Sequence, residues 1–112
     1  MKSNEENGDT RALRAAFFES CGIDISSAEE QEHSITLPEN DTEAVRVFTS
    51  VQKQNGFDAL PLLGKTVTKY SYLLEAEDVV ASLYVLKGNV VGAELFCLDT
   101  FSYIPVSEFG DL

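Results

Sequence analysis

Residues 79–98, VVASLYVLKGNVVGAELFCL, form two apolar segments on either side of a short polar break. Both segments are rich in β-branched and aromatic residues, which favour strands. A two-residue turn at Gly88-Asn89 is typical of a β-hairpin and places Leu83 opposite Glu94. Because both faces of this hairpin are then largely apolar, we expect it to lie in the middle of a sheet or under cover on both sides.

Two further strands are predicted upstream of this hairpin. Residues 66–74 alternate, with Tyr70 and Tyr72 on one face and Val67 on the other. A polar turn at 75–78 connects this strand to the hairpin. A short strand at 34–37 also alternates, and it stops where a proline removes a backbone donor.

Two helices are predicted in the first half of the chain. The first spans residues 10–21, and Gly22 ends it by adopting a left-handed conformation. The second begins after Asn40 or Asp41, either of which is a good N-cap, and ends at Gly56 in the same way. Each helix has one apolar stripe, so each needs a surface on which to pack. The stripe of the second helix consists of Ala44, Val47, Phe48 and Val51.

The order helix, strand, helix and three strands predicts an α+β fold. We expect two helices packed on an antiparallel sheet of three to four strands. Residues 1–8 are polar and are predicted to be disordered, which leaves a single domain over residues 9–112. The acidic segment 24–33 is predicted to be a loop, with the only histidine, His33, on its surface.

Composition limits the function. The net charge is −11, from 19 acidic and 8 basic residues, which argues against a nucleic-acid partner and against binding to anionic lipid headgroups. The longest apolar runs are too short to span a bilayer, so we expect no direct membrane insertion by this segment. One histidine and two cysteines predict no metal site and no cofactor. Cys21 and Cys97 either form a bridge or remain as two buried thiols.

Glu94 is the most unusual charged residue, because it lies in an apolar strand. A buried carboxylate is costly unless it is paired, so we expect it to pair with Lys69 or Lys65 or to reach water at a sheet edge. Its interpretation as a structural carboxylate stands beside a functional one, in which it is the polar group of an apolar groove. Six aromatic residues either line such a groove or belong to the core: Tyr70, Tyr72, Tyr84, Phe96, Phe101 and Tyr103.

Residues 51–58, VQKQNGFD, end the second helix. The stop itself needs only Gly56 and an apolar residue after it. Gln52, Lys53 and Asp58 are not required by that geometry, so we treat them as candidate binding residues together with Tyr70, Tyr72 and Glu94. They either tie the helix end to Gly64-Lys65, which we favour, or point outward to a partner.

Several short motifs occur at characteristic spacing, and they are Phe48, Val51-Gln52-Lys53, Gly56-Phe57-Asp58, Gly64-Lys65, Val67-Thr68-Lys69-Tyr70-Ser71-Tyr72, Gly92-Ala93-Glu94 and Asp99-Thr100-Phe101. In these motifs the chain resembles the domain of unknown function family 4830. It departs from the family pattern where Phe48-Thr49 replaces Tyr-Asn, Leu62 replaces a tyrosine and Glu94 replaces an aspartate. A site built from those polar groups would be altered here.

The resemblance implies a small domain outside the cytoplasmic membrane, anchored by an N-terminal segment absent from this chain, as in proteins of Gram-positive anaerobes. The family carries no established activity, so no catalytic residue is transferred. We expect a non-enzymatic binding or protein-interaction module with a protein or envelope ligand, and a homodimer remains open. The alternatives are a small-ligand sensor and a hydrolase with Glu94 or Asp58 as general base.

Overall fold

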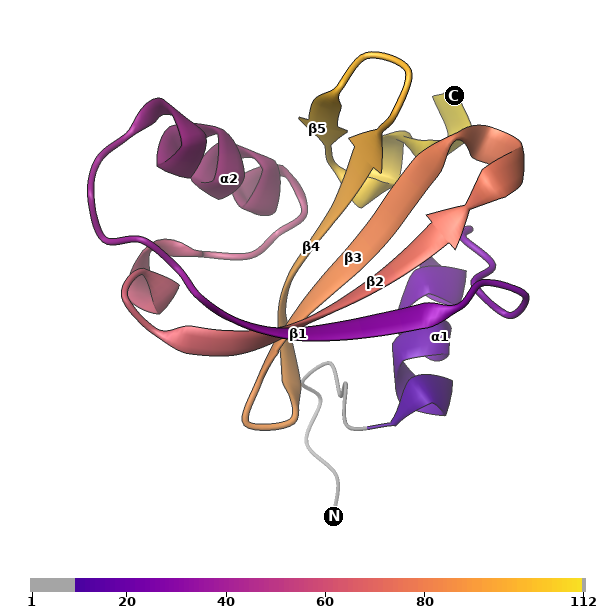
Figure 1. Ribbon diagram of the computed structural model, residues 1–112, viewed down its shortest axis with the longest axis horizontal. Helices are drawn as coiled ribbons and strands as arrows, with labels where there is room; N and C mark the ends of the chain where they lie inside the picture. The colour runs from indigo at the N-terminus through magenta and orange to yellow at the C-terminus, as the bar shows by residue number, and fades with distance from the viewer. Residues whose placement is uncertain (1–9, 112) are drawn as a thin grey trace.

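The computed structural model describes residues 10–111, in which two helices lie on opposite sides of one antiparallel sheet (Figure 1). The α+β class is therefore confirmed. The elements in chain order are α1 (Arg11–Ser20), β1 (Glu30–Thr36), α2 (Glu43–Gln54), β2 (Thr66–Leu74), β3 (Val79–Leu86), β4 (Asn89–Cys97) and β5 (Ser102–Ile104). The sheet order follows the chain from β1 to β5. The predicted disordered segment 1–8 lies outside the described residues.

The sheet has five strands, so the prediction of three to four strands was too low. The additional strand, β5, has only three residues, too few to give an alternation pattern in the sequence. The strand expected at 34–37 begins earlier, at Glu30, and His33 lies within it. Strand β1 lies at the edge of the sheet and most of its side chains are exposed. Polar residues are therefore tolerated along it, and the sequence shows no alternation of apolar and polar residues there.

The predicted register of the hairpin was wrong by one residue. The turn lies at Lys87-Gly88, where both residues have positive φ (53° and 81°), as a primed turn requires. A β-bulge between Tyr84 and Val85 then shifts the pairing by one residue, so that Glu94 lies opposite Ser82, not Leu83.

Helix α1 follows the sequence prediction closely. The side chain of Thr10 accepts a hydrogen bond from the backbone N–H of Leu13 at the N-cap, and Gly22 ends the helix with φ 81°. Phe18 is fully buried and its ring meets that of Tyr72 edge-on, with centroids 5.7 Å apart. This contact places α1 on the face of the sheet that carries Tyr72, which we call the α1 face.

A buried arginine fixes α1 to the first two strands. Arg14 is 5% exposed and donates hydrogen bonds to Glu30 of β1 and to the hydroxyl of Tyr72 of β2. Its guanidinium lies 3.7 Å from the centre of the Tyr70 ring, an arrangement that favours a cation. Tyr72 also donates to Glu30, so three side chains from three elements form one closed network.

Helix α2 starts one or two residues later than expected. Its N-cap is Thr42, whose hydroxyl accepts from the N–H of Val45, and not Asn40 or Asp41. At the other end Gly56 has φ 88°, as predicted. The phenylalanine after this glycine reaches across to α1.

Candidate functional site

The end of α2 is attached to β4 by two side chains that bond to the same residue. Gln52 Oε1 accepts the N–H of Ala93 at 2.7 Å, and Asn55 Nδ2 donates to the Ala93 carbonyl at 2.6 Å. Gln52 is fully buried. The hypothesis that Gln52 ties the helix end to Gly64-Lys65 was therefore wrong. Gln52 bonds to Ala93 instead, because the pairing of β4 with β5 stops before Ala93 and leaves its backbone groups without a strand partner at this edge.

Gly92 allows α2 to approach β4 this closely. A Cβ atom on Gly92 would lie 3.0 Å from Gln52 Oε1 and 3.3 Å from Cδ2 of Tyr84. The ring of Phe48 in α2 lies edge-on to the same tyrosine, with centroids 5.2 Å apart. Helix α2 is therefore held over the face of the sheet that carries Tyr84, which we call the α2 face.

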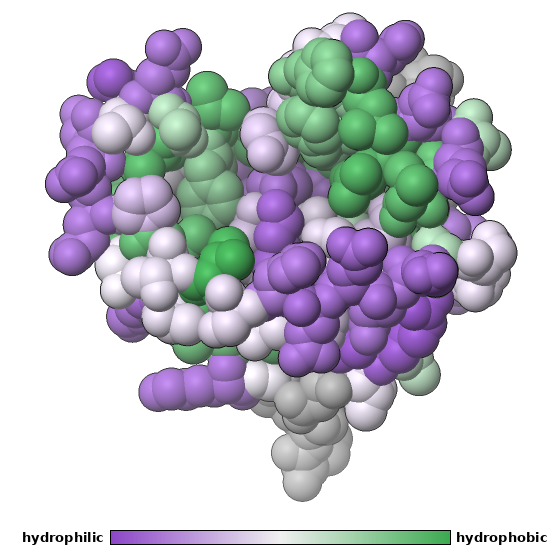
Figure 2. Space-filling model, in the orientation of Figure 1, coloured by the Kyte–Doolittle hydropathy of each residue, from purple (hydrophilic) through white to green (hydrophobic). Residues whose placement is uncertain are grey.

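A cleft of about 640 Å³ opens between α2 and the β4–β5 region on this face. Figure 2 shows it as a hollow between two groups of hydrophobic residues. The wall on the α2 side is formed by Glu43, Ala44, Val47 and Phe48. Ala44 and Val47 belong to the stripe that the sequence predicted to be packed, yet both are exposed, with Val47 41% accessible.

Glu94 lies in the wall of this cleft on the sheet side and is 3% exposed. Its Oε2 accepts a hydrogen bond from the hydroxyl of Tyr84 at 2.8 Å and lies 3.4 Å from Lys69 Nζ. The predicted pairing with Lys69 is confirmed. Tyr84 is a partner that the sequence did not indicate, because β3 supplies it only in the observed register.

Burial raises the pKa of Glu94 above the usual value of a carboxyl group. The charge of Lys69 and the hydrogen bond from Tyr84 act in the opposite direction but do not fully compensate. Burial and the adjacent carboxylate also raise the pKa of the Tyr84 hydroxyl, which therefore remains a hydrogen-bond donor. A carboxyl group with a raised pKa in a cleft is a common feature of functional sites.

The opposite wall of the cleft contains two exposed aromatic residues, Phe101 and Tyr103. Phe101 is 77% exposed and has φ 51°, a left-handed conformation that is costly for a large side chain. Its ring lies 6.1 Å from that of Phe96 in β4. Backbone strain at an exposed aromatic residue is a reason to suspect function, since neither burial nor turn geometry accounts for the residue type.

An exposed apolar row extends from this wall across the α2 face. Leu73, Val80, Phe96 and Tyr103 are cross-strand neighbours on β2 to β5. Leu73 is 46% exposed and Tyr103 is 44% exposed, so neither helix covers the ends of this apolar row. Single exposed hydrophobic residues are ordinary, but a contiguous row beside a cleft is typical of an interaction surface.

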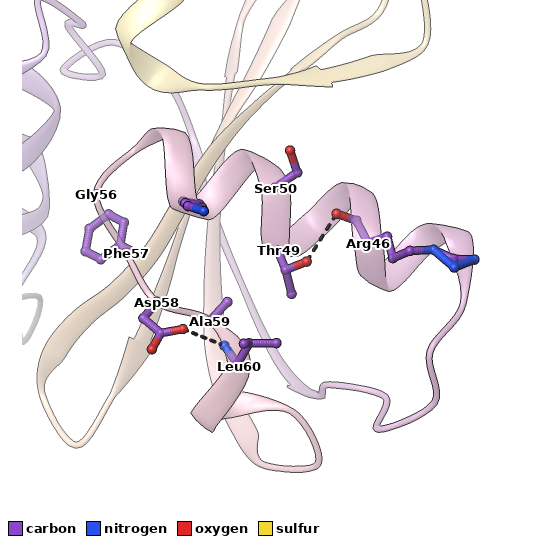
Figure 3. Close-up of a pocket in the computed structure, with 9 residues that line it drawn as sticks. Arg46, Thr49, Ser50, Gly56, Phe57, Asp58, Ala59 and Leu60 are labelled. Carbon is purple, nitrogen blue, oxygen red and sulfur yellow. Dashed lines mark hydrogen bonds between the residues drawn. The ribbon is translucent and has the colours of Figure 1, made fainter.

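Lys53 and Asp58 lie outside the cleft, around a second hollow of about 610 Å³ between the outer side of α2 and the loop after it (Figure 3). Asp58 Oδ1 accepts a hydrogen bond from the backbone N–H of Leu60, so it caps a short turn. Arg46 points away from the loop that carries Asp58. Polar groups do not converge here, and we do not place the site in this hollow.

Phe57, at the start of this loop, connects the end of α2 to α1. Phe57 packs against Phe17 of α1, with ring centroids 6.2 Å apart. Most of the VQKQNGFD segment therefore organises the helix end, and it does so by contacting both β4 and α1.

Tyr70 and Tyr72 lie on the α1 face, on the opposite side of the sheet from Glu94. Tyr72 is fully buried and belongs to the network with Arg14. The six candidates from the sequence are therefore not brought together: Glu94 lies in the cleft, Gln52 is buried next to it, and the remaining four lie elsewhere. Of the aromatic residues considered for a groove, Tyr84, Phe101 and Tyr103 do line it.

Within residues 10–111, no helix is long and apolar enough to cross a membrane, and no group of three or more metal-ligating side chains is clustered. Cys21 and Cys97 are not joined by a disulfide bond. No family model matches the chain, and no curated protein or solved structure matches it. The class that the fold and the site define is therefore an α+β domain with a cleft and an apolar row on the α2 face of its sheet.

Proposed function

We propose that this chain is a non-enzymatic binding module that receives its partner on the α2 face, with the cleft as the centre of recognition. The observation that carries this proposal is the combination of an exposed apolar row with a cleft that contains a buried carboxylate. Apolar surface around the cleft supplies affinity, and the single buried carboxylate in its wall supplies selectivity.

The position of the domain is proposed from the family resemblance. We propose that it is held outside the cytoplasmic membrane by an N-terminal anchor and meets a protein or envelope ligand there. In intact source cells, a membrane-impermeant protease should then remove the domain, as detected with an antibody against it. Protection of the domain until the cells are lysed would contradict this location.

The binding surface is tested by site-specific photo-cross-linking in the source organism. A photoreactive amino acid at Tyr103 should give a discrete adduct, whereas the same group at Glu32, an exposed position on β1, should not. Excess unlabelled domain should compete the adduct away. An adduct of twice the mass of the chain identifies a homodimer, and equal labelling from both positions rejects the α2 face as the binding surface.

A hydrolase remains the second candidate, because Glu94 lies in a cleft with Tyr84 and Lys69 beside it. In that case Glu94 is the general base, and Glu94→Gln should lower turnover of a chromogenic ester or glycoside by about 100-fold or more. Absence of turnover by the wild-type protein across such a panel supports the binding module. The small-ligand sensor is the third reading, and it differs from the first only in the size of the ligand.

A further inference from the structure

We infer that the cleft binds an organic ammonium group, which Glu94 Oε1 meets from the sheet side and aromatic rings surround. This inference rests on the proposed binding function and names the chemistry of the ligand. The ammonium group belongs either to a lysine side chain of a partner protein or to a small free amine, and the two sources share the same recognition.

The first argument is the unused oxygen of Glu94. Both neighbours of this carboxylate, Tyr84 and Lys69, contact Oε2. Among the described residues, Gln52 Nε2 is the only buried side-chain polar atom that lacks a hydrogen-bond partner. No hydrogen bond to Glu94 Oε1 is found within residues 10–111, and this oxygen is not among the fully buried atoms without a partner, so it is not completely shielded from solvent. Because Glu94 lines the cleft, the cleft is where Oε1 can meet a ligand.

The second argument is the composition of the walls. Four aromatic side chains line the cleft, and they are Phe48, Tyr84, Phe101 and Tyr103. The face of an aromatic ring attracts a cation electrostatically, and several rings around a carboxylate form the usual enclosure for an ammonium group. The structure already contains a comparable arrangement, since Lys69 Nζ lies 5.4 Å from the centre of the Tyr84 ring.

The third argument is charge. Two carboxylates, Glu43 and Glu94, line the cleft, and in the described part of the chain no basic side chain does. Lys69 offsets one of these charges from outside the lining, which leaves the cleft negative. The net charge of −11 also attracts cations to the surface as a whole. An anionic ligand would find neither a basic side chain nor a favourable field here.

The inference is tested by NMR titration of the ¹⁵N-labelled protein with tetramethylammonium and with butylammonium. Two neutral compounds of similar size serve as controls: tert-butyl alcohol for tetramethylammonium, and butanol for butylammonium. We expect both cations to shift the resonances of residues around the cleft and to bind at least about tenfold more tightly than the neutral compounds. Equal affinity for charged and neutral compounds would overturn the inference.

Three variants locate the binding. Glu94→Gln keeps the shape and an oxygen for Tyr84 but removes the charge, so it should weaken ammonium binding by about tenfold. Tyr103→Ala should weaken it severalfold, because it removes an exposed wall of the cleft. Glu32→Gln removes an exposed carboxylate on β1 that does not line the cleft, so it should leave binding unchanged. An equal loss in Glu32→Gln and Glu94→Gln would show general charge attraction only and would reject the site.

The source of the ammonium group is distinguished in a second titration. A short peptide with one lysine, blocked at both ends, is compared with the same peptide carrying acetyl-lysine. Tighter binding of the unmodified peptide than of butylammonium identifies a protein lysine, and the reverse order identifies a free amine. A cross-linked partner without any ammonium binding would reject this inference alone, whereas ammonium binding without a position-specific adduct would reject the protein-partner function alone.

Discussion

Asn55, the C-cap of α2, and Ala93 of β4 are joined by a hydrogen bond that replaces part of the sheet. Asn55 Nδ2 donates to the Ala93 carbonyl, and Asn55 Oδ1 accepts the N–H of Val106 at 2.9 Å. The pairing of Leu95 with Ile104 would place Val106 opposite Ala93 if β5 continued. The carboxamide therefore stands between β4 and the C-terminal segment and satisfies one backbone group of each.

Removing this carboxamide should destabilise the fold. Asn55→Ala leaves the carbonyl of Ala93 and the N–H of Val106 without their partner, and we expect a loss of about 1–3 kcal/mol. The free energy of unfolding in urea measures it. Gln54→Ala, one residue earlier and exposed, is the matched control and should change stability by less than about 0.5 kcal/mol. Equal stability of the two variants would show that the Asn55 bridge contributes nothing.

Gly92→Ala should also destabilise, against the usual benefit of replacing glycine in a strand. The new Cβ would lie 3.0 Å from Gln52 Oε1, so Gln52 must move and its bond to Ala93 is weakened. We expect a loss of about 1–3 kcal/mol. In a Gln52→Ala background the same change should cost clearly less, because the nearest obstructing atom is gone and only the contact with Tyr84 Cδ2 at 3.3 Å remains. Additive effects in this double-mutant cycle would contradict the proposed contact.

The Arg14 network predicts a pH dependence of stability. Partial burial opposes ionisation of Glu30, but hydrogen bonds from Tyr72 and Arg14 outweigh it and hold the pKa of Glu30 below its usual value. A depressed folded-state pKa contributes stability that is present above the unfolded pKa and is lost as pH falls through the folded pKa.

Urea unfolding from about pH 6 to about pH 3 should therefore show a steeper loss of stability in the wild type than in Glu30→Gln, which has no charge to lose. Glu29→Gln, at the position before β1, is the control and should follow the wild-type curve. The interpretation fails when Glu30→Gln loses stability as steeply as the wild type over this range.

Phe101 should show opposite effects on stability and binding. Its left-handed backbone strains a phenylalanine but suits asparagine, so Phe101→Asn should keep or raise stability, by up to about 1 kcal/mol. The same variant should weaken ammonium binding in the NMR titration, because a wall of the cleft is removed. A variant that loses stability but binds normally would assign Phe101 a structural role.

Local patterns were sufficient for much of the fold. The glycine stops at Gly22 and Gly56 were predicted because the left-handed conformation is a property of one residue and its neighbours. Strand β2 was predicted with both its ends and its two faces, since its alternation is continuous. The pairing of Glu94 with Lys69 followed from the cost of an unpaired buried charge.

The candidate site depended on long-range packing. A one-residue change of register decides whether Glu94 shares a face with Leu83 or with Ser82, and no local pattern fixes it. Likewise, the stripe of α2 predicted a buried face, yet Val47 remains exposed because Gln52 and Asn55 attach the helix by its end.

The sequence by itself determined where the chain turns and which residues alternate, since those properties depend on neighbouring residues. Only the tertiary structure decided that α1 and α2 cover opposite faces, so that Tyr72 is buried in the core while Tyr84 and Glu94 line a cleft. The physical reason is that both faces of the central strands are apolar, and such strands do not specify which face each helix will cover.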